Sequence, residues 1–435
     1  MCKFGGTSMG SADAITRVID IIRSDKDRKY IVVSAPGKVD GEGKITDQLI
    51  ALADEYLTKG TMRGFNKIRA RYVEIAKALK IDAKFKPVLE ATRVEMQQIK
   101  TKDFIVSRGE YLMGRLLSYV LDFPFIDSRN LVRFTKNKLD YGKTNRLMRE
   151  VLKKNPYVVI SGFYGSDEHG SIKVLSRGGG DVTGALVARG VEASLYENWT
   201  DVDGFLAADP RIISNPKQIA TITYKELRVL SFMGASVLHS EAYFPVAKKG
   251  IPIQIKNTFN PSHPGTRIVA TIENTSKTEI TGIAGLKDFT LVVVEKQLMS
   301  ELVGFDRKIL RIAEKMDINV EHFPSGTDTF SMMIESKYLV DGKLDTLVQT
   351  IKKILKPDLV EVSNHISLIS IVGRNLMSNN QNMFRFFSAL VNANISLKMI
   401  DYGSNGVNIV IGVNDEDYGF AIQAIYKEFV EKGLS

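Results

Sequence analysis

The 435-residue chain has very few of the residues that build disulfide frameworks and structural zinc sites. Its one cysteine, Cys2, cannot form an internal disulfide. One cysteine and five scattered histidines also cannot build a structural zinc site. A single thiol fits a reducing compartment, so we expect a cytoplasmic protein. We expect Cys2 to be a packed bystander rather than a nucleophile.

Long hydrophobic runs and blocks of like charge are missing too. No apolar stretch approaches the roughly 20 residues of a membrane-spanning helix. The formal net charge is +9, but the 59 lysines and arginines are spread along the chain. Dispersed charge argues against a nucleic-acid-binding tail and favours anionic small molecules only weakly. We therefore expect neither a membrane nor a nucleic acid as partner.

Strand and helix signals alternate through the first two thirds of the chain. The run Tyr30–Ser34 predicts a strand, and Thr46–Tyr56 and Arg63–Lys102 predict helices. Tyr157–Ile160 and Ile172–Leu175 predict the two strands of a hairpin. Further strands are expected around 194–196 and 251–255. This alternation predicts a layered α/β domain with a mostly parallel sheet.

The pattern changes after a polar stretch at 271–281, which reads as a linker. Two apolar segments then recur 77 positions later: 289–294 at 366–371, and 330–334 at 407–411. Between them, 318–320 matches 394–396. Each half has the order strand, helix, strand, strand, helix, which predicts two ferredoxin-like modules that could enclose a small ligand. The alternative is a purely structural duplication.

A lysine stands beside a double-glycine turn at Lys3–Ser8, and the helical pattern of Ser11–Arg23 follows. Glycines let backbone N–H groups approach an anion, and a helix start favours negative charge. The pattern is neither a Walker loop nor a Rossmann fingerprint. These residues alone favour a phosphate site and a plain strand–helix turn about equally.

A second glycine cluster, Ser176–Asp181, precedes a predicted helix at 182–188. Three glycines before a helix make a nest of backbone donors. Arg177 offers a planar fork for a carboxylate. Asp181 has two interpretations: it holds a lysine in place, or it caps the helix.

Glu110 is the third candidate group. The apolar run 103–106 predicts a strand and 111–121 a helix, so Glu110 is expected at a strand-to-helix transition. A carboxylate there is placed to meet an ammonium group, or it simply favours the helix start. The polar loop Thr200–Arg211 carries ordinary turn signals.

Taken together, these segments resemble the aspartokinase branch of the amino-acid kinase family over nearly the whole chain. The motifs that carry the resemblance are Lys3–Ser8, Val33–Ala35, Ile45–Asp47, Gly109–Glu110, Arg177–Asp181, Thr200–Arg211, Phe232–Ala235, Val237–His239 and Lys256–Thr258. The C-terminal half resembles the tandem ACT domains of monofunctional members, most clearly at Met399–Ser404 and Val407–Ile409. The resemblance implies an amino-acid kinase domain at 1–272 and ACT domains at 281–360 and 361–435, with terminal strands open to exchange.

The function implied by the resemblance is phosphorylation of the side-chain carboxylate of L-aspartate by MgATP. Formation of the product, 4-phospho-L-aspartate, is the first step of lysine, threonine and methionine biosynthesis. An aspartate carboxylate is already ionised at neutral pH, so its attack needs no general base. Phosphoryl transfer then depends on alignment and charge neutralisation. ATP is the implied cosubstrate, with Mg²⁺ bound mainly through the nucleotide and no dedicated protein metal site.

Family analogy also assigns roles to residues. Lys3 neutralises charge on the transferring phosphoryl group, and Asp181 orients Lys3. Glu110 meets the α-ammonium of aspartate, Arg177 meets a carboxylate, and the full set of substrate residues is Ser34, Thr46, Glu110, Arg177, Gly178 and Gly179. The implied nucleotide residues are Lys3, Phe4, Gly5, Gly6, Thr200, Asp201, Leu206, Arg211, Ser236 and Val237. An amino-acid effector is expected near Met299, Gly304 and Asp306.

The sequence departs from the family where Ser236 replaces a nucleotide-site lysine and Leu206 an aromatic residue. A serine supplies no positive charge. The alternative function is therefore a non-catalytic or weakly active amino-acid-sensing homologue, and a third is a kinase of glutamate or acetylglutamate. For the kinase, lysine is the first expected inhibitor and threonine the second. Exposed sheet edges in ACT modules tend to pair, so a homodimer or homotetramer is expected.

Overall fold

The computed structural model describes residues 1–39, 41–176, 178–235, 238, 240–273, 279–374, 376, 380–402 and 406–432. The chain forms two compact units that each combine several segments. The first contains Met1–Phe205, Gln218–Leu227 and Val237–Ile272, and the second contains Leu206–Lys217, Arg228–Ser236 and Glu273–Ser435. The domain boundaries expected from the sequence stay predictions.

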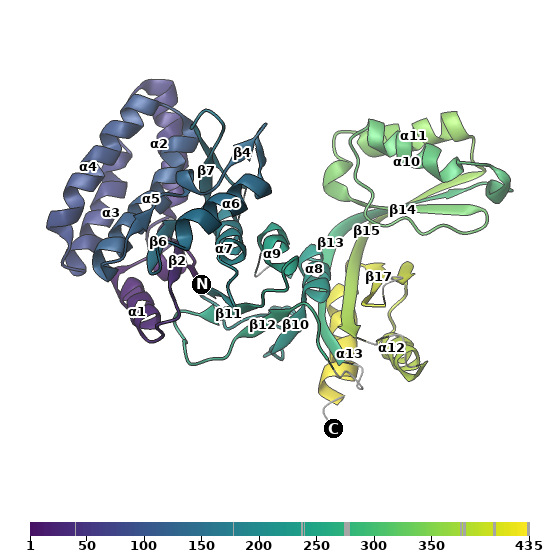
Figure 1. Cartoon of the computed structure of the whole chain (residues 1–435). Helices are drawn as coiled ribbons and strands as arrows, with labels where there is room; N and C mark the ends of the chain where they lie inside the picture. Colours follow the sequence, from purple (N-terminus) through teal and green to yellow (C-terminus); the bar gives the residue numbers. More distant parts are fainter. Residues whose placement is uncertain are drawn as a thin grey trace. The chain divides into compact units, whose positions relative to one another are not determined.

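The first unit is built on a sheet that has eight strands within the described part of the chain (Figure 1). Their order is β10-β12-β11-β9-β1-β2-β6-β3, and every pair except β11–β12 is parallel. The strands are β1 Cys2–Phe4, β2 Tyr30–Val33, β3 Phe125–Ile126, β6 Val158–Ser161, β9 Tyr196–Thr200, β10 Thr221–Thr223, β11 Ile253–Asn257 and β12 Thr266–Val269. The predicted layered α/β fold with a mostly parallel sheet is confirmed. A further small pair, β4 Phe134–Thr135 and β5 Lys138–Leu139, lies outside it.

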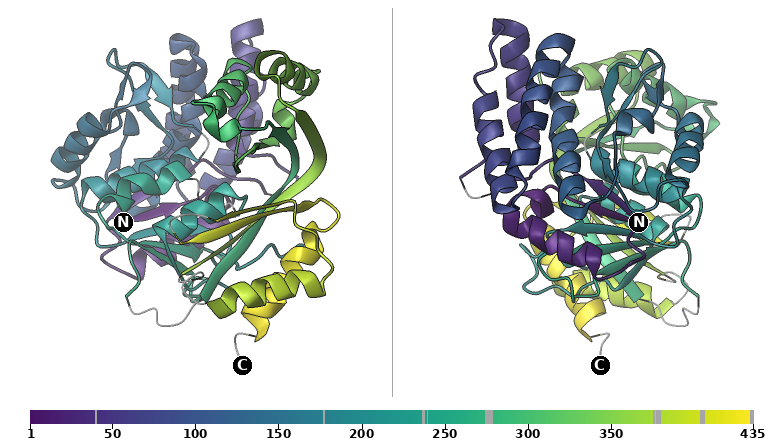
Figure 2. Two further views of the ribbon diagram at one scale, coloured as in Figure 1. Left: turned by 90° about the vertical axis from the view of Figure 1, so that its right-hand side faces the viewer. Right: turned by 60° about the vertical axis from the view of Figure 1, so that its left-hand side comes forward.

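The helices α5 and α7 pack directly on this sheet, and α2 to α4 pack on α5 and on one another. In α1, Ser11 accepts a hydrogen bond from the Ala14 amide, and Ile15, Val18 and Ile22 are buried on one face. The helices are α1 Ala12–Arg23, α2 Ile45–Lys59, α3 Phe65–Ala78, α4 Asp82–Ile99, α5 Lys102–Leu121, α6 Tyr141–Leu152, α7 Gly179–Gly190, α8 Tyr224–Phe232 and α9 Ser240–Ala247. Figure 2 shows α2 to α5, drawn in purple and blue, standing side by side.

The centre of the first unit's core is β1, which is only three residues long. Cys2 and Phe4 are fully buried, and Trp199 of β9 stacks on Phe4 with ring centroids 6.0 Å apart. Strands of a parallel sheet are buried on both faces, which explains the apolar runs of the neighbouring strands β2 and β6. Burying an apolar side chain of this size stabilises the fold by roughly 1.5–3 kcal/mol.

The expected hairpin is wrong in its first strand. Val158–Ser161 is β6, which lies in the central sheet between β2 and β3. The hairpin instead pairs β7 Tyr164–Ser166 with β8 Ile172–Val174. The chain turns between β6 and β7 at Phe163, which has a φ of 78°. The fully apolar run suits a strand buried on both faces better than a hairpin arm.

The expected strand at 103–106 is also wrong. The helix α5 is continuous from Lys102 to Leu121, so Glu110 lies in its middle and not at a transition. Phe104, Ile105 and Val106 are all buried because α5 packs against α2, α4 and β6. A short apolar run does not distinguish a buried strand from a buried helix, and here tertiary burial decided.

In the second unit, the strands order as β14-β13-β15-β17-β16, all antiparallel, in a sheet of five described strands. The duplicated segments 289–294 and 366–371 lie in β13 and β15, where Phe289 is paired with Ile366. The segments 330–334 and 407–411 lie at β14 and β17. The segments 318–320 and 394–396 lie outside the strands. The elements are β13 Glu279–Glu295, α10 Phe305–Lys315, β14 Thr329–Glu335, α11 Lys343–Leu355, β15 Leu359–Arg374, α12 Asn380–Asn392, β16 Met399–Tyr402, β17 Asn408–Asn414 and α13 Tyr418–Tyr426.

The segment Leu206–Lys217, which comes from before residue 272, packs within this second unit. The amide of Ile283 donates to the Ala207 carbonyl at 2.7 Å. The amide of Lys217 donates to the Tyr426 hydroxyl, also at 2.7 Å. These contacts join residues about 76 and 209 positions apart in the chain, so no local sequence signal marks them.

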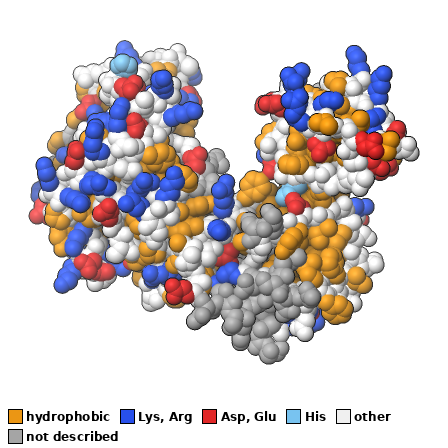
Figure 3. Space-filling view, turned by 45° about the vertical axis from the view of Figure 1, so that its right-hand side comes forward, with side chains coloured by type: hydrophobic (Ala, Val, Ile, Leu, Met, Phe, Trp, Pro, Cys, Tyr) orange, Lys and Arg blue, Asp and Glu red, His pale blue; other side chains and the backbone are white. Residues whose placement is uncertain are grey.

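Charge on the surface follows the pattern of the sequence. Figure 3 shows Lys and Arg side chains scattered over the visible face rather than gathered in one patch. Within the described residues, none of the helices combines the length and the apolar character that crossing a membrane requires.

Close packing of α7 on the sheet gives a test of this fold. A Cβ at Gly184 would overlap the Tyr196 hydroxyl and lie 3.1 Å from Cβ of Lys3. We expect Gly184→Ala to lower the free energy of unfolding by about 1–3 kcal/mol because the interface is already full. Urea unfolding measures this. The control is Gly142→Ala in α6, where the new Cβ meets only Asp140 Oδ1 at 3.5 Å; equal stability of the two variants would contradict the packing.

Candidate active site

The carboxyl ends of the central parallel strands meet at one edge of the first unit's sheet. Gly5 follows β1, Ser34 follows β2, Gly162 follows β6 and Asp201 follows β9. Backbone hydrogen bonds join these strand ends. The Ser34 amide donates to the Phe4 carbonyl at 3.1 Å, and the Gly162 amide donates to the Val33 carbonyl at 3.0 Å. Open α/β sheets bind ligands outside the carboxyl ends of their strands. This edge is therefore the candidate site.

Lys3 is held at this edge by a buried ion pair. Its Nζ lies 2.5 Å from Oδ1 of Asp181, and both side chains are largely buried. Asn198 donates its side-chain amide to the same Oδ1 at 3.0 Å, and the Tyr196 hydroxyl donates to the Asp181 carbonyl at 3.2 Å. These contacts fix the position of the Lys3 ammonium. Asp181 therefore contacts the lysine, as one of its two sequence interpretations requires.

Glycines keep the space beside this ammonium free. A Cβ at Gly5 would lie 3.6 Å from Lys3 Nζ. A Cβ at Gly180 would lie 2.8 Å from Ser34 Oγ and 3.5 Å from Lys3 Cε. The start of α7 thus lies against Lys3 and Ser34, and the left-handed N-cap of this helix, with a φ of 82°, is Gly178. A side chain at Gly5 or Gly180 would therefore lie directly against the Lys3 side chain.

Glu110 is buried in the middle of α5, at 5% exposure. Burial raises the pKa of its carboxyl to about 7, although the Ala35 amide and the charges of Arg108 and Lys3 act in the opposite direction. Its Oε2 is buried and has no hydrogen-bond partner among the described residues. An unpartnered buried carboxylate oxygen is costly. A ligand ammonium would satisfy it.

The neighbours of Glu110 come from the loop after β2 and from the start of α2. A Cβ at Gly109 would lie 2.7 Å from Cβ of Ala35 and 3.4 Å from Cγ2 of Ile45. Thr46 directly follows Ile45 at the N-terminal end of α2, so this threonine, Ser34 and Glu110 lie in the same region. The structure thus brings together three of the predicted substrate residues, which the sequence separates widely.

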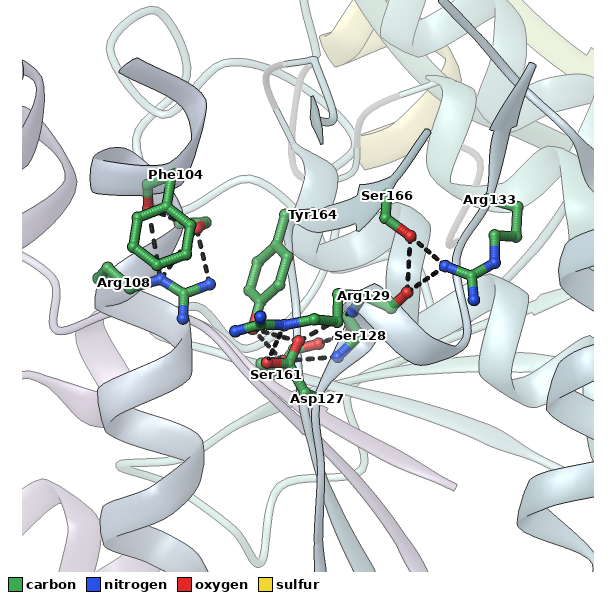
Figure 4. Close-up of polar contacts among 10 residues, drawn as sticks. Phe104, Arg108, Asp127, Ser128, Arg129, Arg133, Ser161, Tyr164 and Ser166 are labelled. Carbon is green, nitrogen blue, oxygen red and sulfur yellow. Dashed lines mark hydrogen bonds and ion pairs between the residues drawn. The ribbon is translucent and has the colours of Figure 1, made fainter. Parts of the chain in front are cut away.

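Besides Lys3, the unit contains a buried cation on α5, which is Arg108 (Figure 4). Its guanidinium is fully buried and lies 4.2 Å, 4.5 Å and 5.3 Å from the ring centroids of Phe104, Tyr111 and Tyr164. It donates to Ser107 Oγ at 3.0 Å. Beyond it, the Tyr164 hydroxyl donates to Asp127, which also pairs with Arg129. Aromatic faces rather than a carboxylate surround this charge.

The predicted nucleotide residues Thr200 and Asp201 lie at the end of β9. The Thr7 hydroxyl donates to Asp201 Oδ2 at 3.0 Å and the Thr200 hydroxyl to Oδ1 at 3.2 Å. Because Thr7 follows the glycine turn, this carboxylate is linked to the loop that begins at Lys3. Phe4 contributes only its backbone to the turn, since its ring is buried against Trp199.

Other predicted site residues fall elsewhere. Leu206 and Arg211 belong to the second unit, where Arg211 forms an ion pair with Asp209 at 2.6 Å. Arg177, Ser236 and Val237 lie outside the described residues. The roles expected for these five residues stay predictions.

The predicted effector residues surround the start of α10. Met299 is buried in a short 3₁₀ turn, and its amide donates to Asp328 at 3.2 Å. Gly304 caps α10 with a φ of 74°, and Asp306 is exposed in its first turn. The neighbouring exposed hydrophobic side chains are Leu298, Leu302 and Val303. Exposed apolar groups beside a helix start are consistent with a binding surface.

Sequence reasoning missed two residues at the site. Asn198 holds Asp181, and its signal was a polar residue within the strand Tyr196–Thr200. Phe163 has a φ of 78°, and a Cβ at Gly179 would lie 2.8 Å from its ring. A positive φ at a bulky residue is strained, and such strain clusters at functional sites. Its sequence signal was the Gly162 just before it, which marks a turn at a strand end.

Among the described residues, no group of three or more His, Cys, Asp or Glu side chains could hold a metal ion.

Comparison with known proteins gives consistent matches. The model of the amino acid kinase family matches residues 1–257, and an ACT domain model matches residues 369–429. Aspartokinase 3 of Bacillus subtilis is 33% identical, with 98% of each chain covered. The crystal structure of Clostridium acetobutylicum aspartate kinase is 42% identical, with a TM-score of 0.90 and 98% and 99% of the two chains covered. E. coli aspartokinase III in complex with aspartate and ADP is 25% identical, with a TM-score of 0.74 and 98% of each chain covered.

The raised pKa of Glu110 predicts a pH-dependent stability. The ordinary pKa of this carboxyl is 4.5, and its pKa in the folded protein is about 7. Between these pH values the carboxyl is ionised in the unfolded chain and largely protonated in the folded protein. The burial of Glu110 therefore lowers the free energy of unfolding increasingly as pH rises through this range. Glu110→Gln removes this cost. In urea unfolding without substrates, we expect its stability relative to wild type to rise between pH 4.5 and 7, by at most roughly 3 kcal/mol, and then level off. A difference that does not change with pH would contradict the pKa.

Proposed function

The chain belongs to the aspartokinases of the amino acid kinase family, and we propose that it phosphorylates the side-chain carboxylate of L-aspartate with ATP. The product is 4-phospho-L-aspartate, the first intermediate on the way to lysine, threonine and methionine. One observation carries the proposal: the Lys3 ammonium, fixed by Asp181, and the unpartnered Glu110 carboxylate oxygen lie in the same unit beside the carboxyl ends of its strands. The relatives favour a kinase over a non-catalytic sensor.

Substrate recognition follows from charge. The Glu110 carboxylate accepts the α-ammonium of aspartate, and this contact satisfies its free oxygen. The Ser34 hydroxyl and Thr46 lie nearby to bind the amino-acid part, and Gly178 and Gly179 let the start of α7 approach it. Arg177 is assigned to a substrate carboxylate on family resemblance. The E. coli relative with bound aspartate supports this class of substrate.

Phosphoryl transfer uses the fixed lysine. The attacking carboxylate is already ionised, so the barrier lies in alignment and in charge on the transferring group. Lys3 neutralises that charge, and Asp181 and Asn198 hold it in place before the reaction begins. Such preorganised groups need no rearrangement in the transition state. Gly5 lies beside Lys3, since a Cβ there would be 3.6 Å from Lys3 Nζ, and we assign the transferring phosphate to this position.

The nucleotide is assigned to the same edge of the sheet. The turn of Phe4, Gly5 and Gly6 is assigned to the phosphates on family resemblance, and Thr200 and Asp201 lie beside this turn. Mg²⁺, held mainly by phosphate oxygens, supplies additional charge neutralisation when the nucleotide is bound. Leu206, Arg211, Ser236 and Val237 complete the assignment on family resemblance. The relative solved with ADP supports a nucleotide as cosubstrate.

Regulation is assigned to the duplicated second unit. An amino acid bound near Met299, Gly304 and Asp306 inhibits the kinase by favouring a conformation with lower substrate affinity. Lysine is the first candidate and threonine the second. Pairing of exposed sheet edges between chains gives a homodimer or homotetramer. A cytoplasmic location completes the proposal.

Replacing the fixed lysine tests the catalytic assignment. Trapping acyl phosphate as hydroxamate should give a positive signal for wild type with L-aspartate, ATP and Mg²⁺. Lys3→Ala should lower kcat at least about a thousandfold because it removes the charge that meets the transferring group. The control Lys67→Ala changes an exposed lysine of α3 and should behave as wild type. A wild type without acyl phosphate at any ATP and Mg²⁺ concentration would refute the kinase, and an active Lys3→Ala would refute the role of Lys3.

Inhibition by amino acids tests the regulatory assignment. Initial rates are measured with L-lysine and L-threonine, alone and together. We expect the rate to fall with lysine, the first candidate, or otherwise with threonine. Asp306→Asn should raise the half-inhibiting concentration roughly tenfold, since a charge-assisted contact is lost. Its matched control is Asp345→Asn, which changes the acidic residue in the first turn of α11 instead of α10. Insensitivity of wild type to both amino acids would contradict the assignment.

A further inference from the structure

A second cationic site lies on the opposite face of the same sheet. In the register of β1 and β9, Lys3 is paired with Asn198 and Phe4 with Trp199. On the other side of β9, Trp199 is paired with Lys256 of β11. Successive side chains of a strand point to opposite faces. Lys256 therefore lies on the face of Phe4 and Trp199, opposite to Lys3. The hollow on this face is lined by none of the residues assigned to aspartate or nucleotide.

This face carries a hollow of about 420 Å³ over β9, β11 and β12. A pocket of that size takes a small organic molecule. Three cationic side chains and one carboxylate line it, so its formal charge is positive. The lining residues are Arg28, Glu197, Gln218, Ala220, Gln254, Lys256, Pro264, Gly265 and Arg267.

One side of the hollow is rigid and already paired. Arg28 donates to both oxygens of Glu197, at 2.7 Å and 3.0 Å. Glu197 also accepts hydrogen bonds from the Trp199 indole at 3.1 Å and from the Cys2 thiol at 3.0 Å. These groups hold the carboxylate that balances Arg28. They leave the other two cations of the hollow without a balancing charge.

Lys256 and Arg267 are those two cations. Lys256 donates one hydrogen bond, to the His263 carbonyl at 2.5 Å, which leaves two N–H groups of its ammonium. Burial lowers its pKa, so a nearby anion would favour its charged form. The exposed Arg267 side chain forms no ion pair or hydrogen bond within the described residues. Neither cation has a carboxylate within 4.0 Å in the part of the chain that the structure covers.

We propose that this hollow binds a small multivalent oxyanion, of the phosphate or the polycarboxylate type, between Lys256 and Arg267. The arginine fork and the lysine ammonium line one hollow and offer hydrogen-bond donors and positive charge to the oxygens of such a ligand. Gln254 borders the same space, and its register partners are Glu197 and Arg267. The site is separate from catalysis and stands independently of the kinase assignment.

The single tryptophan of the chain reports on this site. Arg28 and Lys256 lie 5.4 Å and 5.5 Å from the Trp199 ring centroid, so an anion bound to Lys256 changes the surroundings of the ring. Intrinsic fluorescence of the full chain is titrated with inorganic pyrophosphate and, separately, with citrate. Sodium chloride at matched ionic strength controls for screening. We expect a saturable change with at least one of the two anions, and the tighter one identifies the type.

Variants locate the response. Lys256→Gln/Arg267→Gln should weaken the apparent Kd at least roughly tenfold, because two charge-assisted contacts are lost. The control Lys67→Gln/Lys84→Gln removes the same charge from exposed positions of α3 and α4 and should bind as wild type. Lys3→Ala should also bind as wild type, since it lies on the other face. Arg267→Lys, which keeps the charge and loses the fork, should give an intermediate Kd.

Three results would overturn the proposal. The first is a fluorescence change that sodium chloride reproduces or that never saturates. The second is unchanged binding in the Lys256→Gln/Arg267→Gln variant while its urea unfolding midpoint equals that of wild type. The third is loss of the response in Lys3→Ala together with its retention in the double variant, which would place the anion at the kinase site.

Discussion

The ion pair between Lys3 and Asp181 is the contact on which the candidate site depends. It joins the central strand β1 to the first turn of α7, and Asn198 of β9 holds the same carboxylate. Removing one partner of a buried pair leaves an uncompensated charge and costs roughly 3–5 kcal/mol. The position of the ammonium is therefore fixed by the same packing that holds the helix on the sheet.

Alternation along β1 and β9 gives the two faces of the sheet different tasks. Lys3 and Asn198 face α7, and the glycines of that helix leave room beside the ammonium. Phe4 and Trp199 face the other way and stack in the core. One short strand thus supplies both a charged group for chemistry and an apolar group for stability. The hollow at Lys256 and Arg267 extends the second face beyond this core.

The sequence predicted the alternating layers, the glycine turn at Lys3 and the helix after Gly178, because these depend on local patterns. It misplaced Glu110 at a strand end, since an apolar run buried on all sides has no helical period. It also missed Asn198 and Phe163, whose roles arise from contacts between distant segments. Likewise, the packing of Ala207 and Lys217 in the second unit has no local signal.

The most direct test of the central claim is to measure kcat and the KM for aspartate of Asp181→Asn and to compare both with wild type. The amide keeps the size of the side chain and removes the charge that fixes Lys3. We predict that kcat falls roughly 10²–10³-fold while KM for aspartate changes little, because Glu110 and Ser34 still bind the amino acid. A folded Asp181→Asn enzyme with wild-type kcat would contradict the account.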